Sequence, residues 1–325
     1  ESRGLGDVYK RQPSSISVNP YSGNVYITDA YDYKVKGDVL CFSPQGQLIF
    51  KLPNVGINSN TVLFRNKASQ GNPDENPADP EAGAFANKVL EYNPAPSQYM
   101  NTSYTAYEEG FTGIQVLARA TELLQDRTTC LFTLGGFGGN ITVGFDHTIP
   151  NVPGEYDFKI YGNAYYDMYG TLLDKPGGNS EPGIVLVSKD TNGNGLPDDE
   201  WYELAGSEYN SPATIRNYEI TYYRPTPADG DVKWKDNQGK EGYIYRNTYH
   251  TQGSYYPAWM PAEITFRGSR LADNSINEPR PGMPEHWVGY CYAWGYADNH
   301  PNNTEYSQFK IDWAVDKDGK PVHLD

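Results

Sequence analysis

Short segments in which apolar and polar residues alternate recur through most of the chain. Such alternation is typical of strands with one buried face. Gly, Pro and Asn separate the segments, as turns between strands require. Strands are therefore predicted at residues 15–18, 24–29, 37–42 and 47–50, and again at 130–134, 140–145, 155–161, 184–187, 218–223, 262–266, 288–294 and 309–315.

Helical spacing of apolar positions occurs in residues 112–125, with apolar side chains at 114, 117, 120 and 124. The predicted fold is therefore mainly β: a jelly-roll-like β-sandwich with one amphipathic helix. A small N-terminal meander of four strands precedes it, and about 45 residues for four strands is the size of one propeller blade.

Four regions follow from these patterns. Residues 1–12 (ESRGLGDVYKRQ) resemble a translated sequencing-adaptor remnant, so they are excluded from fold reasoning. Residues 13–64 form the blade-like meander, the polar, proline-bearing residues 65–87 form a linker, and residues 88–325 form the sandwich. We expect a signal sequence and a C-terminal end to lie outside this sequence.

Composition narrows the function classes. The net charge is −15 and no Lys/Arg cluster is present, which argues against a nucleic-acid partner. No apolar stretch approaches the roughly 18 residues of a transmembrane span. Cys41, Cys130 and Cys291 are too few and too scattered for a disulfide framework or a zinc site, so we expect them to be small buried apolar residues.

Residues 190–201 read DTNGNGLPDDEW, an alternation of oxygen-bearing side chains and glycines typical of calcium-binding loops. The register of an EF-hand loop fits through nine positions, with Gly195 at the sixth, but Trp201 stands where a bidentate glutamate is expected. Strand-like segments flank the loop, so it is not a helix-loop-helix unit. The predicted ligands are Asp190, Asn192, Asn194, the Leu196 carbonyl and Asp198, with Asp199 or Glu200 closing the shell.

A metal-free hairpin turn is the alternative for this loop, because Asn-Gly is itself a strong turn signal. A bare turn needs one Asn-Gly and gains nothing from the three acids that follow. Calcium, with a structural role, is therefore the predicted cofactor.

Aromatic residues make up 14% of the chain, including 28 Tyr. Such rings can stack on sugar faces or on a corrin while their hydroxyls bond polar edges. The long Gly/Ser/Pro-bearing loop 247–259 is the predicted ligand contact, through Tyr249, Tyr255, Tyr256 and Trp259. The alternative is that tyrosines and tryptophans here cap the core and line sheet edges.

Catalytic signatures are weak. A strand follows the GGFGG run at 135–139, which makes it a tight turn and not a phosphate cradle. No HExxH or Gly-x-Ser-x-Gly pattern is present. We therefore predict a protein that is not an enzyme, with a secreted hydrolase of glycan or peptide and a structural or adhesion spacer as the alternatives.

Several separated segments carry a resemblance. Residues 16–46, with ISVNP, SGNVYITD and VLCF, look like a blade of NHL or YncE-like surface propellers. The resemblance implies that this is the last blade and that the missing propeller blades lie outside this sequence. The remaining segments, at 134–149, 156–164, 181–190 and 294–300, resemble uncharacterised cell-surface proteins of Bacteroidota, in which a discoidin-like or carbohydrate-binding-module-like sandwich follows a propeller.

This resemblance implies an exported protein at the cell surface, similar to an outer-membrane lipoprotein. Its expected role is to capture a small molecule or glycan, with outer-membrane transport proteins as partners. Some propellers of similar type capture cobalamin, so a corrinoid is one candidate nutrient. The resemblance does not name the ligand or the oligomeric state.

Overall fold

The computed structural model describes residues 15–18, 24–29, 37–56, 83, 85–124, 131–167 and 175–324. The chain divides into two compact units, Glu1–Ala78 and Asp79–Asp325. Each unit is described by itself. Cys130 lies outside the described residues, and so does the predicted linker except for residues 83 and 85–87.

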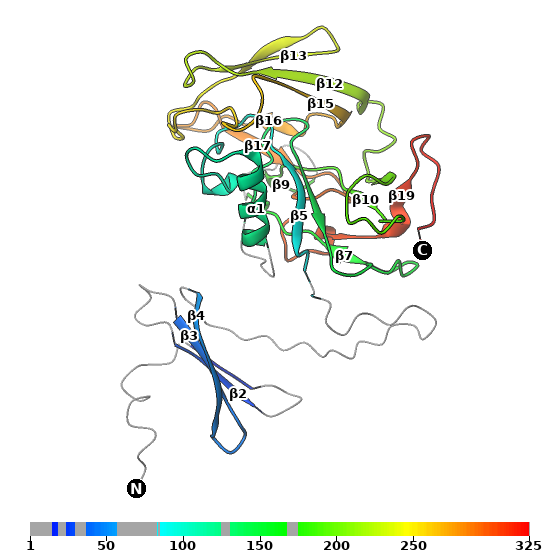
Figure 1. Cartoon of the computed structure of the whole chain (residues 1–325). Coiled ribbons are helices and arrows are strands. Elements are labelled where there is room, and N and C mark those ends of the chain that lie inside the picture. The colour runs from blue at the N-terminus through cyan, green and yellow to red at the C-terminus, as the bar shows by residue number, and fades with distance from the viewer. Residues whose placement is uncertain are drawn as a thin grey trace. The chain divides into compact units, whose positions relative to one another are not determined.

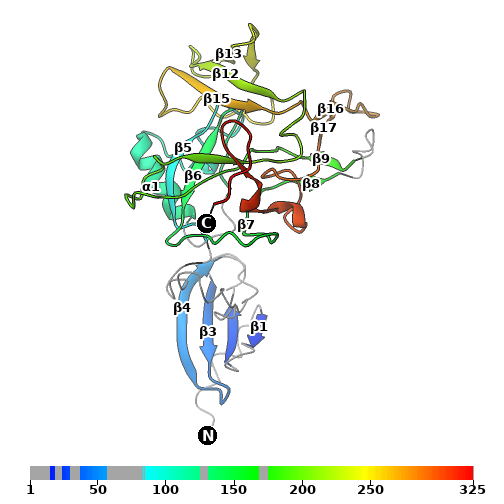
Figure 2. The ribbon, with the colours of Figure 1, turned by 90° about the vertical axis from the view of Figure 1, so that its right-hand side faces the viewer.

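The first unit contains a four-stranded antiparallel sheet in sequential order (Figures 1 and 2). Tyr26 pairs with Cys41 and Cys41 with Phe50 across neighbouring strands, and the Cys41 side chain is fully buried. The predicted four-stranded meander is confirmed. Its strands are β1 (Ser15–Val18), β2 (Val25–Asp29), β3 (Gly37–Phe42) and β4 (Leu48–Gly56).

The second unit is mainly β, with several antiparallel sheets and one α-helix in its described part, an architecture consistent with the predicted β-sandwich. One four-stranded sheet has the order β14 (Glu241–Ile244), β13 (Val232–Asp236), β12 (Ile215–Tyr223) and β15 (Glu263–Arg270). A second sheet of four has the order β16 (Ser275–Asn277), β17 (Trp287–Tyr290), β9 (Gly177–Asn179) and β8 (Tyr165–Tyr166). Smaller sheets join β10 (Leu186–Ser188) with β11 (Trp201–Leu204) and β19 (Ala314–Val315), β5 (Lys88–Asn93) with β6 (Asn140–Gly144), and β7 (Phe158–Lys159) with β18 (Gln308–Phe309).

Alternation explains the packing of the sheet that contains β12. Tyr218, Ile220 and Tyr222 alternate with half-buried residues and pack in one core with Val232 of β13 and Phe266 of β15. Trp234 lies over Gly242, where an added Cβ would come within 2.7 Å of the indole. The glycine therefore lets a large ring enter the inner face of the sheet.

The helix α1 (Gly113–Leu124) matches the predicted segment. It begins after Thr112, whose backbone N–H and hydroxyl both donate to the Gln115 side chain. Of the predicted apolar positions, Ala120 is buried and Leu117 and Leu124 pack against the same core, together with Val116, while Ile114 is 82% exposed. Residue 114 lies in the first turn of the helix.

Other strand predictions need correction. Residues 131–134 are not a strand, and the segment predicted at 309–315 contains β18, the 3-10 helix η5 (Ile311–Trp313) and β19. The hairpin of β13 and β14 was not predicted. The turn at 135–139 is confirmed, because Gly139 N–H donates to the Gly136 carbonyl and β6 follows directly.

Candidate functional site

The predicted calcium loop lies at the tip of a hairpin. Strands β10 and β11 pair antiparallel, with Ser188 opposite Trp201 at the end next to the loop. The Trp201 indole N–H donates to the Pro197 carbonyl at 3.2 Å. Both ends of residues 190–200 are therefore held by the ladder.

The Asp190 carboxylate organises the first half of the loop. Its Oδ1 accepts the N–H groups of Gly193 and Asn194 at 2.7 and 3.2 Å, and its Oδ2 accepts that of Gly195 at 2.7 Å. Gly193 and Gly195 have φ of +71° and +72°, a conformation that favours glycine. This curl directs three backbone dipoles at one side chain.

The second half of the loop folds back over the first. The Asn194 Nδ2 lies 3.1 Å from Asp198 Oδ2, and Asn192 Nδ2 lies 3.3 Å from Asp198 Oδ1 and 3.4 Å from Asp199 Oδ2. The Thr191 hydroxyl, which the sequence reading missed, donates to Asp199. Two carboxylates and two amides therefore converge.

Glu200 stands apart from this group, because its carboxylate accepts the Tyr202 hydroxyl at 2.9 Å. Of the two acids considered for closing the shell, Asp199 is the one placed beside the other predicted ligands. The Leu196 N–H donates to Asn194 Oδ1 at 2.7 Å, and the Leu196 side chain is exposed.

The residue types of the loop match calcium in number and kind, although their arrangement does not form a group that holds a metal. Asp190, Asn192, Asn194, the Leu196 carbonyl, Asp198 and Asp199 offer oxygen atoms, and calcium takes six to eight. Here amide hydrogens of Asn192 and Asn194 face the carboxylates that a cation would neutralise. Across the described ranges, no group of three or more His, Cys, Asp and Glu side chains is arranged to hold a metal ion.

Two hairpin turns elsewhere provide an internal comparison. Asp236 Oδ1 accepts the N–H groups of Gln238 and Lys240, and Asp316 Oδ1 accepts those of Asp318 and Lys320. Several turns of this chain are therefore stabilised in the same way, by an aspartate at the start of the turn that accepts backbone N–H groups. What distinguishes residues 190–199 is the return of two further carboxylates.

The predicted aromatic contacts separate into buried and accessible residues. Tyr255 and Tyr256 are 1% and 0% exposed and belong to the core beneath β12, so neither ring can touch a ligand in this arrangement. Asn101, with φ of 57°, fastens this segment: its Nδ2 donates to the carbonyls of Ser254 and Tyr256. These two tyrosines are therefore core residues, as the alternative interpretation of the aromatic residues has it.

Tyr249 is 90% exposed, whereas Trp259 is half-buried. The Trp259 ring stacks on Tyr107 with centroids 5.4 Å apart and packs against the core of α1 and β5. The structure does not group the four predicted residues into one surface.

Glu181, two residues after the end of β9, and Asp298 form a carboxyl pair that the predicted sites do not include. Burial and the charge of Asp298 raise the pKa of Glu181, and burial raises the pKa of Asp298. Asp298 Oδ1 accepts the N–H groups of Asn163 and Ala164 at 2.7 and 2.8 Å, which ties this carboxylate to a turn. Carboxyl groups with shifted pKa values can mark catalytic sites. The Asp298 carboxylate, however, already accepts two backbone N–H groups.

Replacing Glu181 with Gln tests whether the buried charge of Glu181 lowers the stability of the folded state. A raised native pKa means that the folded state binds the proton more tightly, so stability falls as pH rises from below 4.5 through the native value. We expect Glu181→Gln to be more stable relative to the natural protein at about pH 7 than at about pH 4. Urea unfolding at both values measures this, and an equal difference at both would contradict it.

Asn299 and His300 form a buried network that joins distant segments. Asn299 is 0% exposed; its Oδ1 accepts the Tyr292 N–H at 2.8 Å and its Nδ2 donates to the Tyr292 carbonyl at 2.9 Å. His300 Nε2 also contacts that carbonyl, at 2.7 Å, while its Nδ1 lies 2.8 Å from the Tyr166 hydroxyl. Burial lowers the pKa of His300, which favours the neutral imidazole. These roles are structural.

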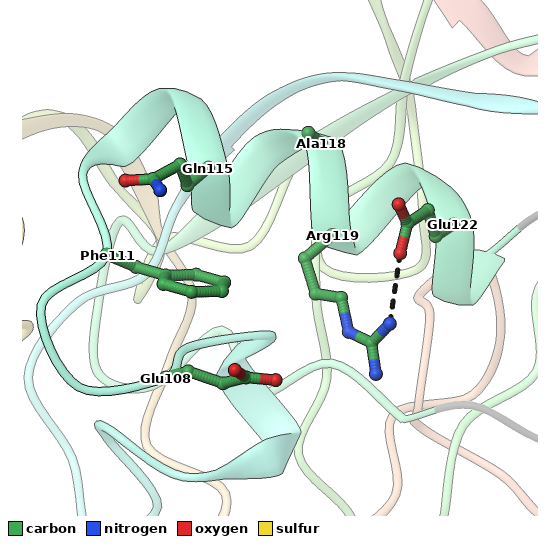
Figure 3. A pocket seen from close by; sticks show the side chains of 6 residues that line it. All are labelled: Glu108, Phe111, Gln115, Ala118, Arg119 and Glu122. Carbon is green, nitrogen blue, oxygen red and sulfur yellow. Dashed lines mark hydrogen bonds and ion pairs between the residues drawn. The ribbon is translucent and has the colours of Figure 1, made fainter.

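A hollow of about 260 Å³ lies beside α1, where Phe111 and Arg119 form opposite parts of its wall (Figure 3). Arg119 is paired with Glu122 at 3.0 Å, so its charge is compensated within the wall. None of the predicted site residues contributes to it. Its lining residues are Glu108, Phe111, Gln115, Ala118, Arg119 and Glu122.

No protein-family model matches the chain, and no curated protein sequence matches it. Within the described residues, none of the helices has the length and apolar character needed to cross a membrane.

Proposed function

We propose that the second unit is an extracellular, calcium-stabilised binding module that captures a glycan or another nutrient ligand such as a corrinoid. The observation that carries the proposal is the convergence of Asp198 and Asp199 on a loop already curled around Asp190. Extracellular calcium modules bind at roughly 10⁻⁴–10⁻³ M, so a site of this kind suits calcium levels outside cells.

The metal would have a structural role. Asp190, Asn192, Asn194, Leu196, Asp198 and Asp199 would hold it, and its charge would offset the repulsion between the two returning carboxylates. Asp190 keeps the loop curled through its hydrogen bonds with Gly193 and Gly195.

Calcium is expected to raise the melting temperature by about 1–5 °C at roughly 1 mM, which corresponds to about 0.4–1.4 kcal/mol of linkage. The double variant Asp198→Asn, Asp199→Asn should lose this response, because it removes both returning charges and leaves the Asp190 hydrogen bonds. Scanning calorimetry with CaCl₂, MgCl₂ or EDTA provides the measurement.

Asp316→Ala is the matched control, since it removes the leading aspartate of a comparable turn that is followed by one acid, Asp318, and not by a returning pair. It should lower stability but keep the calcium response. An unfolding temperature of the natural protein that is the same in calcium and in EDTA would sink the calcium proposal and favour the bare turn.

A secreted hydrolase is the second candidate, favoured by the raised pKa values of Glu181 and Asp298. Release of reducing ends from soluble polysaccharides, abolished in Glu181→Gln, would support it. Capture without turnover supports the binding module, and the absence of both would support a spacer role.

A further inference from the structure

The outer face of the sheet β14-β13-β12-β15 is a surface that the predicted ligand contacts did not include. Core residues alternate along its strands, so the residues between them point to the opposite face. In both views of the second unit these strands lie at its edge (Figures 1 and 2). The outward residues are Glu219, Thr221, Tyr223, Lys233, Lys235, Glu241, Tyr243, Glu263, Thr265 and Arg267.

Tyrosine rings form the apolar part of this face. Tyr243 and Tyr245 are 47% and 70% exposed, and their ring centroids lie 6.0 Å apart at 39°. Lys233 lies between Tyr243 and Tyr223 in the cross-strand register. The sheet therefore presents two neighbouring accessible rings at its β14 edge and a third tyrosine two strands away.

The polar part of the face carries no net charge. Its three basic residues are balanced by three acidic ones, and Glu241 lies 3.2 Å from Lys233 and 3.5 Å from Lys235. Arg267 and Glu219 form another pair at 2.5 Å. This balance contrasts with −15 for the whole chain, and it matches an uncharged partner better than a polyanion or a polycation.

We propose that this outer face, the tyrosine face of Tyr223, Tyr243 and Tyr245, binds an extended neutral polysaccharide. Pyranose rings have apolar faces that stack on exposed tyrosines and hydroxyl rims that bond Lys, Glu and Thr side chains. A pleated sheet face suits a chain lying across it. The Thr221 and Thr265 hydroxyls, 2.8 Å apart, extend the polar surface beside the rings. The inference rests on the glycan-capturing form of the proposed function and names its surface.

Affinity electrophoresis in gels containing mixed-linkage β-glucan, xyloglucan or galactomannan tests the proposal. We expect at least one polymer to retard the natural protein, and Tyr243→Ala and Tyr245→Ala each to weaken the apparent Kd about 3- to 10-fold. Tyr165→Ala is the matched control, because Tyr165 is 60% exposed on another sheet. It should bind like the natural protein, and thermal unfolding verifies that all three variants fold.

Contrary outcomes separate this inference from the proposed function. Equal retardation of the natural protein and both face variants would place the glycan elsewhere: the tyrosine face is then wrong and glycan capture stands. No retardation by any polymer would overturn this inference and the glycan-capturing form of the proposed function, whereas capture of a corrinoid and the calcium response are measured independently. A concentration-dependent dimer that Tyr243→Ala dissociates, without polysaccharide binding, would identify the face as a protein interface and overturn the inference.

Discussion

Replacement of Tyr256 with alanine is expected to lower the free energy of unfolding by about 3–5 kcal/mol, the usual cost of deleting a large buried aromatic ring. The ring is fully buried, and the Arg224 guanidinium lies 4.7 Å from its centroid. Its hydroxyl donates to the Pro261 carbonyl at 2.7 Å. Denaturant unfolding followed by tryptophan fluorescence measures the loss.

Tyr256→Phe separates the hydroxyl from the ring. It keeps the packing and leaves the Pro261 carbonyl without this donor, so a smaller loss of about 1–2 kcal/mol is expected. If Tyr256→Ala instead unfolded like the natural protein and lost only ligand binding, the ring would be a contact residue and the core assignment would be wrong.

Asn299→Ala is expected to cost about 3 kcal/mol, because it leaves the buried Tyr292 N–H without an acceptor and removes two further hydrogen bonds. His300 still contacts the Tyr292 carbonyl, which limits the loss. The same unfolding experiment provides the value.

The neighbouring Asn303 is exposed, which makes Asn303→Ala the control in the same segment. Its effect should stay within about 0.5 kcal/mol. Similar losses for the two variants would show that the segment, and not the buried amide, determines the change.

Local patterns predicted those features whose hydrogen bonds are local. The helix at 113–124 and the curl around Asp190 both depend on partners within five residues. Spacing and side-chain type are sufficient there. For the same reason the turn at 135–139 could be distinguished from a phosphate cradle by the strand that follows it.

Local sequence patterns could not predict which individual aromatic residues are buried. Tyr249, Tyr255 and Tyr256 lie in one stretch of the sequence, yet one is exposed and two are in the core. Their environment is determined by Asn101, more than 150 residues earlier, which bonds the backbone around Tyr256. No local signal connects these positions.

The tyrosine face was missed because its hairpin was missed. The segment VKWKD of β13 does alternate, and an Asn-Gln-Gly turn follows it, so a signal was present. The signal for Asn299 is weaker. The segment WGYADNH carries a resemblance but no local pattern for a buried amide, because the hydrogen bonds of Asn299 depend on Ser180 and Tyr292.

The pairing of β7 with β18 joins the early and late parts of the second unit, and the nearby hydrogen bond from Gly154 to Asp312 spans 158 residues. At typical ribosomal speeds that stretch takes about 10–30 s to synthesise. The strand around Phe158 must wait for its partner throughout that time. Chaperones that shield apolar segments during translation should therefore matter more for this protein than for one built from sequential hairpins.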